Sequence, residues 1–198
     1  MAKLSKIALP VLLVVTVIGM IVYVNLYSEN DSIFDEIYTN IDKINPPENL
    51  KRKDYSNFDD NEKEYHVVQF TYEDKVSSKY KDIFFAKNNR DRSLEICFTK
   101  ELDRGVKLKM WYIYKIDDKK ADEELLVIDN KGGEERYIDK YSRIKTYLKR
   151  YHVTSKQIEQ SYRLVIRDLV LKDWTKAYNS KYTPSGYNKV KVKKQWEN

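Results

Sequence analysis

The longest apolar stretch of the chain runs from Ile7 to Tyr27 and contains 21 residues without a charged side chain. A helix of this length, at about 1.5 Å per residue, reaches roughly 31 Å, which matches the ~30 Å hydrocarbon core of a bilayer. The stretch is longer than a typical signal-peptide core, and no A-x-A cleavage pattern follows it. It predicts an uncleaved transmembrane signal-anchor, and a cleaved signal peptide is the alternative.

The charges on either side of this stretch predict its orientation. Lys3 and Lys6 precede it, whereas acidic residues such as Glu29 and Asp31 follow it. Because positive residues stay in the cytoplasm, residues 1–6 are expected inside, residues 7–27 in the cell membrane, and residues 28–198 outside as one extracellular domain.

The remaining apolar positions change period along the chain. Ile33, Phe34, Ile37, Ile41 and Ile44 have helical spacing, so a helix is expected between Asp31 and Ile44. Residues 48–64 are polar without a sustained period and are expected to form a loop. From residue 65 onward the apolar positions alternate, which is typical of strands. The expected strands cover 65–72, 81–87, 93–99, 106–116, 125–128 and 135–138.

The strand at 106–116 has the clearest alternation. Val106, Leu108, Met110, Tyr112, Tyr114 and Ile116 are expected on the core face. Lys109, Trp111 and Ile113 are expected on the opposite face, as on a wetted sheet face or a partner surface. In the strand before it, Glu95, Cys97 and Thr99 are likewise expected to point outward.

Two helical patterns follow, at 139–151 and at 154–178. The second begins with Thr154 and Gln157, which fit a capping box, and continues through Ile158, Tyr162, Val165, Leu169 and Trp174. Residues 189–193 alternate like a basic edge strand. Short connected strands followed by helices predict an α+β fold, with an antiparallel meander of about five to six strands packed on helices.

The composition mainly excludes classes of function, such as nucleic-acid binding, metal binding and catalysis by a known motif. The net charge of +6 suggests nucleic acid at first, yet residues 28–198 hold 35 basic and 31 acidic residues, a mild surplus on a domain expected outside the cell. A single cysteine, Cys97, excludes an internal disulfide, and His66 and His152 have no companion at metal-ligand spacing. No catalytic motif or phosphate-binding glycine loop occurs, so no catalytic, cofactor-binding or metal-binding residue is predicted.

The acidic residues Asp117, Asp118, Asp122, Glu123 and Glu124 are expected on one hairpin connection. Such a cluster can steer a basic protein partner, although plain solubility is the alternative. Aromatic side chains are common interface anchors. The predicted protein-binding residues are therefore Lys109, Trp111, Ile113 and this acidic cluster.

An N-terminal anchor, a following helix that begins Ile33-Phe34-Asp35-Glu36-Ile37-Tyr38, and a tyrosine-rich strand meander together resemble the TipC family. The family consists of immunity proteins of Gram-positive bacteria. The resemblance implies a non-enzymatic protein that needs no cofactor. Outside the membrane it would bind and neutralise an LXG-type toxin of a type VII secretion system, which attacks a cell-wall precursor, through a concave sheet surface.

The expected function is therefore that of a membrane-anchored extracellular immunity protein, with a toxin as its partner. Two alternatives remain from the sequence. One is an accessory or structural envelope protein, such as a secretion-apparatus subunit or a cell-wall-binding module. The other is an enzyme that acts at the envelope.

Overall fold

The computed structural model describes residues 32–59, 61–73, 79–103, 105–130 and 133–197. The residues from Ile33 onward form one compact unit. No helix within the described ranges combines the length and the apolar character that a membrane span requires. The predicted signal-anchor at Ile7–Tyr27 lies outside the described residues.

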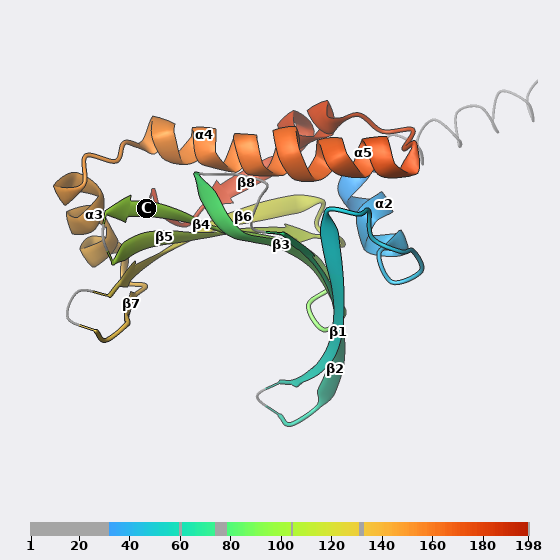
Figure 1. Cartoon of the computed structure of the whole chain (residues 1–198), viewed down its shortest axis with the longest axis horizontal. Helices are drawn as coiled ribbons and strands as arrows, with labels where there is room; N and C mark the ends of the chain where they lie inside the picture. The colour runs from blue at the N-terminus through green and yellow to red at the C-terminus, as the bar shows by residue number, and fades with distance from the viewer. Residues whose placement is uncertain (1–31, 60, 74–78, 104, 131–132, 198) are drawn as a thin grey trace, which may run out of the picture. The chain divides into compact units, whose positions relative to one another are not determined.

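The centre of the unit is a sheet of eight strands in the order β1 to β7, with β8 added beside β6 (Figure 1). The strands are β1 (Leu50–Phe58), β2 (Glu64–Tyr72), β3 (Tyr80–Asn88), β4 (Ser93–Asp103), β5 (Val106–Lys115), β6 (Lys120–Asp129), β7 (Arg136–Ile138) and β8 (Lys191–Lys194). Strands β1 to β7 pair antiparallel, whereas β8 runs parallel to β6. The prediction of an antiparallel meander of five to six strands is therefore wrong: the sheet is mixed and has eight strands.

Strand β1 was missed because it lies at the edge of the sheet. Only Leu50 of its nine residues is buried, so residues 50–58 carry no alternating apolar pattern and resemble a loop. Their strand structure comes from pairing along the whole length of β2, from Leu50 opposite Tyr72 to Phe58 opposite Glu64. Residues 50–58 form a strand because they pair with β2, and their own hydrophobic pattern does not show this pairing.

Strand β6 also differs from the prediction, because it begins at Lys120 and not at Leu125. The connection from β5 is a short turn in which Lys119 adopts a left-handed backbone with φ of 52°. Asp122, Glu123 and Glu124 therefore lie in a strand, and only Asp117 and Asp118 lie in the turn. The buried positions of β6 alternate along the strand and are Ala121, Glu123, Leu125 and Val127. Because one of them is a glutamate, the hydrophobic pattern did not predict the first half of the strand.

Helix α2 (Ile33–Asn40) packs into the core and is an integral part of the unit. Phe34 is fully buried, and its ring stacks at 5.5 Å on Tyr112 and at 4.8 Å on Tyr114. Asp35 accepts a hydrogen bond from the Tyr114 hydroxyl at 3.3 Å and pairs with the Lys119 ammonium at 2.5 Å. The predicted helix and its isoleucine stripe are thus confirmed, with Ile41 buried just beyond the helix end.

A long helical rod covers one face of the sheet. It consists of α4 (Ser155–Val165), the π-helix η1 (Ile166–Leu171) and α5 (Lys172–Tyr178), and it begins with the predicted capping box of Thr154 and Gln157. The apolar positions Ile158, Tyr162, Ile166, Val170 and Trp174 are each four residues apart and all are buried. A four-residue spacing exceeds the 3.6-residue turn of an α-helix, so the wide turn of η1 keeps the stripe on the sheet.

The described helices leave the second face of the sheet uncovered (Figure 1). Helix α3 (Tyr141–Arg150) lies at one end of the sheet, and the 3-10 helix η2 (Pro184–Lys189) leads into β8. Strands β1 and β2 bend away from the rod, so the uncovered face is concave. We refer to it as the open face, and to the other as the covered face.

The burial of Phe34 allows the contribution of α2 to the stability of the folded unit to be tested. Replacing Phe34 with alanine removes a fully buried ring between two tyrosines, so the free energy of unfolding should fall by about 3–5 kcal/mol. Urea unfolding followed by tryptophan fluorescence measures this. Thr39→Ala, at an exposed position of the same helix, is the control and should change stability by less than about 0.5 kcal/mol. Equal stability of the two variants would contradict the assignment of α2 to the core.

Candidate functional site

The open face is formed by the side chains that alternate with the core residues of each strand. On β5 the core positions from Val106 to Tyr114 are buried, and Lys109, Trp111 and Ile113 between them are partly exposed. This confirms the predicted division of the strand into a core face and an outward face. The register then determines which side chains of neighbouring strands join Trp111 and Ile113 on the open face.

Two rows of residues cross the middle of the sheet. In one, Glu95 of β4 and Asp122 of β6 lie on either side of Ile113. In the other, Trp111 lies between Cys97 and Glu124. We call Glu95, Trp111, Ile113, Asp122 and Glu124 the central patch. It joins an indole and an aliphatic side chain to three carboxylates.

The carboxylates of the central patch are close enough to affect one another. Burial raises the pKa of Glu124, and the charges of Asp122 and Glu95 raise it further. The Lys115 ammonium lies 2.7 Å from Asp122, and the Lys109 ammonium lies 4.6 Å from the Trp111 ring centroid. Because like charges have been gathered on a sheet face, a partner that brings basic groups would relieve their repulsion.

The other predicted binding residues lie elsewhere. Asp117, in the turn after β5, pairs with Arg92 at 2.9 Å, and Asp118 is exposed in the same turn. Glu123 lies on the covered face, since it alternates with Asp122 and Glu124, and it is only 3% exposed. The structure thus brings Lys109, Trp111, Ile113, Asp122 and Glu124 together, places Asp117 and Asp118 at the end of the strand pair, and separates Glu123 from all of them.

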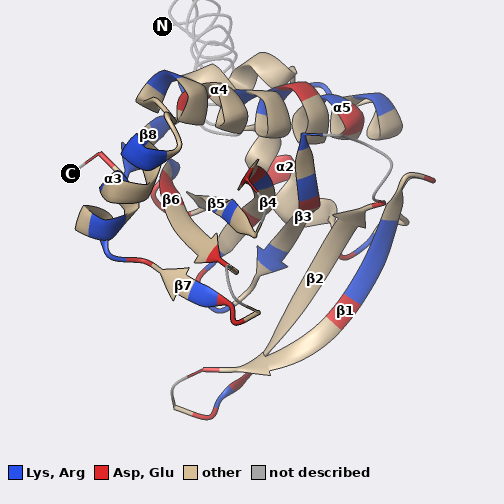
Figure 2. Cartoon of the chain, turned by 60° about the vertical axis from the view of Figure 1, so that its left-hand side comes forward, with Lys and Arg blue, Asp and Glu red and all other residues tan. Residues whose placement is uncertain are grey.

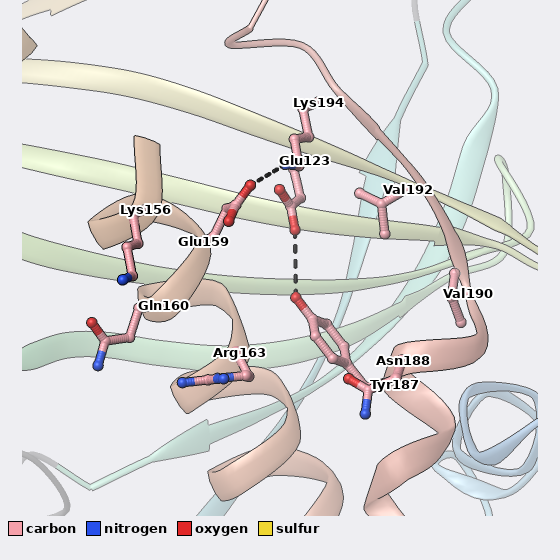
Figure 3. A pocket seen from close by; sticks show the side chains of 10 residues that line it. All are labelled: Glu123, Lys156, Glu159, Gln160, Arg163, Tyr187, Asn188, Val190, Val192 and Lys194. Atoms are coloured by element: carbon pink, nitrogen blue, oxygen red, sulfur yellow. Dashed lines mark hydrogen bonds and ion pairs between the residues drawn. The ribbon is translucent and has the colours of Figure 1, made fainter. Parts of the chain in front are cut away.

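Glu123 instead forms part of a cavity of about 460 Å³ between α4, η2 and β8 (Figure 3). The Tyr187 hydroxyl donates to its Oε1 atom at 3.5 Å, while its Oε2 atom is buried without a hydrogen bond among the described residues. Burial raises the pKa of Glu123 to about 7, despite the nearby Lys194 ammonium and Trp196 indole N–H, which act to lower it. Glu159 pairs with Lys194 at the edge of this cavity.

Sequence reasoning missed Glu95 as a member of the central patch. Its outward direction followed from the alternation of β4, but its neighbours followed only from the register of β4, β5 and β6. Asn88 and Ser93 both donate to its Oε1 atom, at 2.8 and 3.3 Å, and hold the carboxylate in place. Only a prediction of the register between β4, β5 and β6 would have placed Glu95 beside Asp122 and Glu124.

Cys97 points to the open face as predicted, but it is fully buried between its cross-strand neighbours. Burial raises the pKa of the Cys97 thiol to about 12, so the thiol stays protonated and unreactive near neutral pH. Within the described residues, no group of three or more histidine, cysteine or acidic side chains is arranged to hold a metal ion.

A sheet with one face on the core and a concave open face that carries aromatic and charged side chains is typical of a protein-binding domain. The chain belongs to the TipC immunity protein-like family, whose model matches residues 5–195. Membership implies an immunity function against a toxin. This confirms the resemblance found in the sequence.

A solved structure gives the same result for the fold. TipC2 from Streptococcus intermedius B196 superposes with a TM-score of 0.72 and is 29% identical over 84% of this chain and 97% of that chain. A comparison with curated proteins found no match. The similarity to TipC2 therefore extends over nearly all of that protein.

The environment of Glu123 generates a prediction about pH. A carboxyl group with a raised folded-state pKa contributes its full stability below its unfolded value of 4.5, and this contribution is lost as pH rises through about 7. The permanently neutral Glu123→Gln variant avoids the loss. Relative to this variant, the natural protein should lose about 2–3 kcal/mol of unfolding free energy between about pH 5 and pH 8.5.

Urea unfolding at both pH values measures this difference. The control is Glu48→Gln, at an exposed position, which should leave the pH dependence unchanged. A difference between the natural protein and Glu123→Gln that is constant with pH would show that Glu123 titrates normally.

Proposed function

We propose that this chain is a membrane-anchored extracellular immunity protein that binds and neutralises a secreted antibacterial toxin, and that it does so by occlusion without turnover. The family membership supports the immunity function. The proposed partner is an LXG-type toxin of a type VII secretion system that attacks the cell envelope. The proposed mechanism needs no cofactor and no catalytic residue in this chain.

The observation that carries this proposal is the central patch. Trp111 and Ile113 offer partly exposed apolar area in the middle of a concave face, and Glu95, Asp122 and Glu124 surround them with negative charge. Large aromatic side chains at the centre of an interface supply most of its binding energy, and charges around them set orientation and association rate. A basic, convex part of a toxin would complement this surface.

The proposed anchor fits the way in which the chain enters the folded unit. Residues 7–27 supply an uncharged stretch of membrane-spanning length. Residues 28–32 then lead to α2, which packs on the covered side of the sheet with the helical rod. A tether on the covered side leaves the open face accessible to a toxin.

Co-expression tests the function as a whole. The full chain should restore growth of a Gram-positive host that exports the toxin encoded beside it, and a variant without residues 1–27 should not protect when it stays in the cytoplasm. Equal protection by the cytoplasmic variant would contradict the extracellular site of action. Absence of protection by the full, expressed chain would contradict the immunity function toward that toxin.

Trp111→Ala tests the anchor residue of the central patch. Removing an indole from the centre of an interface should weaken toxin binding by about 2 kcal/mol or more, close to a 30-fold increase in Kd, as measured by calorimetry. Tyr182→Ala, which removes an aromatic ring outside the open face, is the matched control and should bind normally. An unchanged Kd for Trp111→Ala would exclude this residue from the interface.

Glu124→Lys tests the charges of the patch. Reversing one of three neighbouring carboxylates should slow association with the toxin by about tenfold at low salt, and by much less at about 0.5 M salt, where charges are screened. Stopped-flow fluorescence measures both rates. Glu48→Lys has the same change of net charge away from the open face and should retain the natural rate. The same rate for both variants would show that the patch does not steer the toxin.

A further inference from the structure

The charges of this protein are divided unequally along the chain. Residues 140–194 contain fifteen lysines and arginines and three acidic residues. Residues 28–139 contain twenty basic and twenty-seven acidic residues. The modest net charge of the chain thus conceals a strongly basic segment and an acidic one.

The basic segment lies mostly in the helices, and its last element, β8, is a strand of the sheet. The segment comprises α3, the rod from α4 to α5, η2 and β8, and Figure 2 shows lysines and arginines along these elements. Two of its three acidic residues are already paired within it, Glu159 with Lys194 and Asp168 with Arg167. Its remaining positive charge is therefore available to an external partner.

Lysines dominate the exposed surface of this segment at its C-terminal part. Between Lys172 and Lys194 there are seven lysines and a single acidic residue, Asp173. Four of these lysines, on α5, on η2 and on the connection between them, have exposed side chains and form no ion pair with the described residues: Lys172, Lys176, Lys181 and Lys189. We call these four residues the basic face; Lys191 and Lys193 of β8 pair with Lys120 and Asp122 and lie on the open face.

The basic face lies next to the point at which the chain enters the unit. A Cβ atom on Gly186 of η2 would lie 3.5 Å from a methyl carbon of Ile33, the first residue of α2. Glu36 of α2 accepts hydrogen bonds from the Trp174 indole at 2.8 Å and from the Ser180 hydroxyl at 2.9 Å. Five residues, 28–32, span at most about 20 Å when fully extended, so the proposed anchoring would keep Ile33 within that distance of the bilayer.

We propose that the basic face docks on an anionic phospholipid surface and holds the open face away from the membrane. The proposal rests on the proposed anchoring by residues 7–27. Lysines attract anionic headgroups within about one Debye length, roughly 8 Å at physiological salt, so the short tether brings them into range.

Docking would give the anchored protein a fixed orientation. The basic face lies on the helical layer that covers one face of the sheet, and the open face is the other face of the sheet (Figure 1), so contact of one with lipid exposes the other to the extracellular space. A toxin would then meet the central patch without rotation of the immunity protein. The lipid contact is a second interaction surface, distinct from the toxin-binding face.

Lysine footprinting of the full chain in vesicles tests the proposal. The chain is reconstituted in vesicles of phosphatidylcholine alone, or with about 30% phosphatidylglycerol, and acetylated with an amine-reactive reagent before mass spectrometry. Phosphatidylglycerol should slow acetylation of Lys176, Lys181 and Lys189 at least threefold, and about 0.5 M salt should reverse the effect. Lys53 and Lys107 of the sheet are internal controls and should react equally in both vesicles.

A charge-reversal variant provides the matched comparison. Lys176→Glu/Lys181→Glu/Lys189→Glu should lose the phosphatidylglycerol-dependent protection of Lys172. Lys43→Glu/Lys53→Glu/Lys63→Glu changes three exposed lysines outside the layer and should keep it. Equal acetylation in the two vesicle types, or equal behaviour of the two variants, would overturn the proposal.

Resistance to alkaline carbonate extraction measures the anchoring separately. If the chain is extracted from both vesicle types, the anchoring fails. The docking is then decided by flotation of the unanchored chain, which should occur only with phosphatidylglycerol and only at low salt. If flotation is absent, or does not depend on lipid charge, the docking proposal is wrong. It is also wrong if the toxin, and not lipid, protects the same lysines from acetylation.

Discussion

The structure depends on the strict alternation of side chains along β5. Its even-numbered residues fill the core, while the odd-numbered residues between them stand on the open face. Because each strand residue points to one face only, the core and the candidate binding surface are built from interleaved positions of the same strand. The central position of β5 in the sheet extends this division to β4 and β6 through the register.

The covered face requires a helical layer that follows a curved sheet. The rod from Ser155 to Tyr178 achieves this because η1 widens one stretch of helix and keeps apolar residues four positions apart in contact with the strands. Phe34 completes the core from the other end of the chain by stacking on Tyr112 and Tyr114. These contacts also fix the side of the sheet at which the chain enters the unit.

Much of the fold was accessible from the sequence wherever burial imposes a period. The alternation of β5, the isoleucine stripe of α2 and the capping box of α4 all predicted the correct element. Strand β1 was not predicted because only Leu50 in it is buried, and the first half of β6 was not predicted because a glutamate, Glu123, occupies one of its buried positions. The parallel pairing of β8 with β6 joins residues far apart in sequence, and no local pattern encodes it.

The candidate site was predicted in part for the same reason. Trp111 and Ile113 followed from alternation alone, whereas Glu95 required the register. Glu123 was grouped with Asp122 and Glu124 on the assumption of a loop, in which adjacent side chains can serve one surface. In a strand they cannot, and Glu123 lies instead beside Tyr187 in a cavity of the covered face. Placement in a strand thus separates residues that are neighbours in sequence.

The interleaving of core and open-face positions also bears on how such a protein can evolve. A substitution at an odd-numbered residue of β5 changes the candidate binding surface without touching the packing beneath it, so this surface can diverge while folding stability is conserved. An insertion or deletion of one residue would exchange the two faces and destroy both. Divergence within this architecture is therefore expected to proceed by substitution at constant strand length.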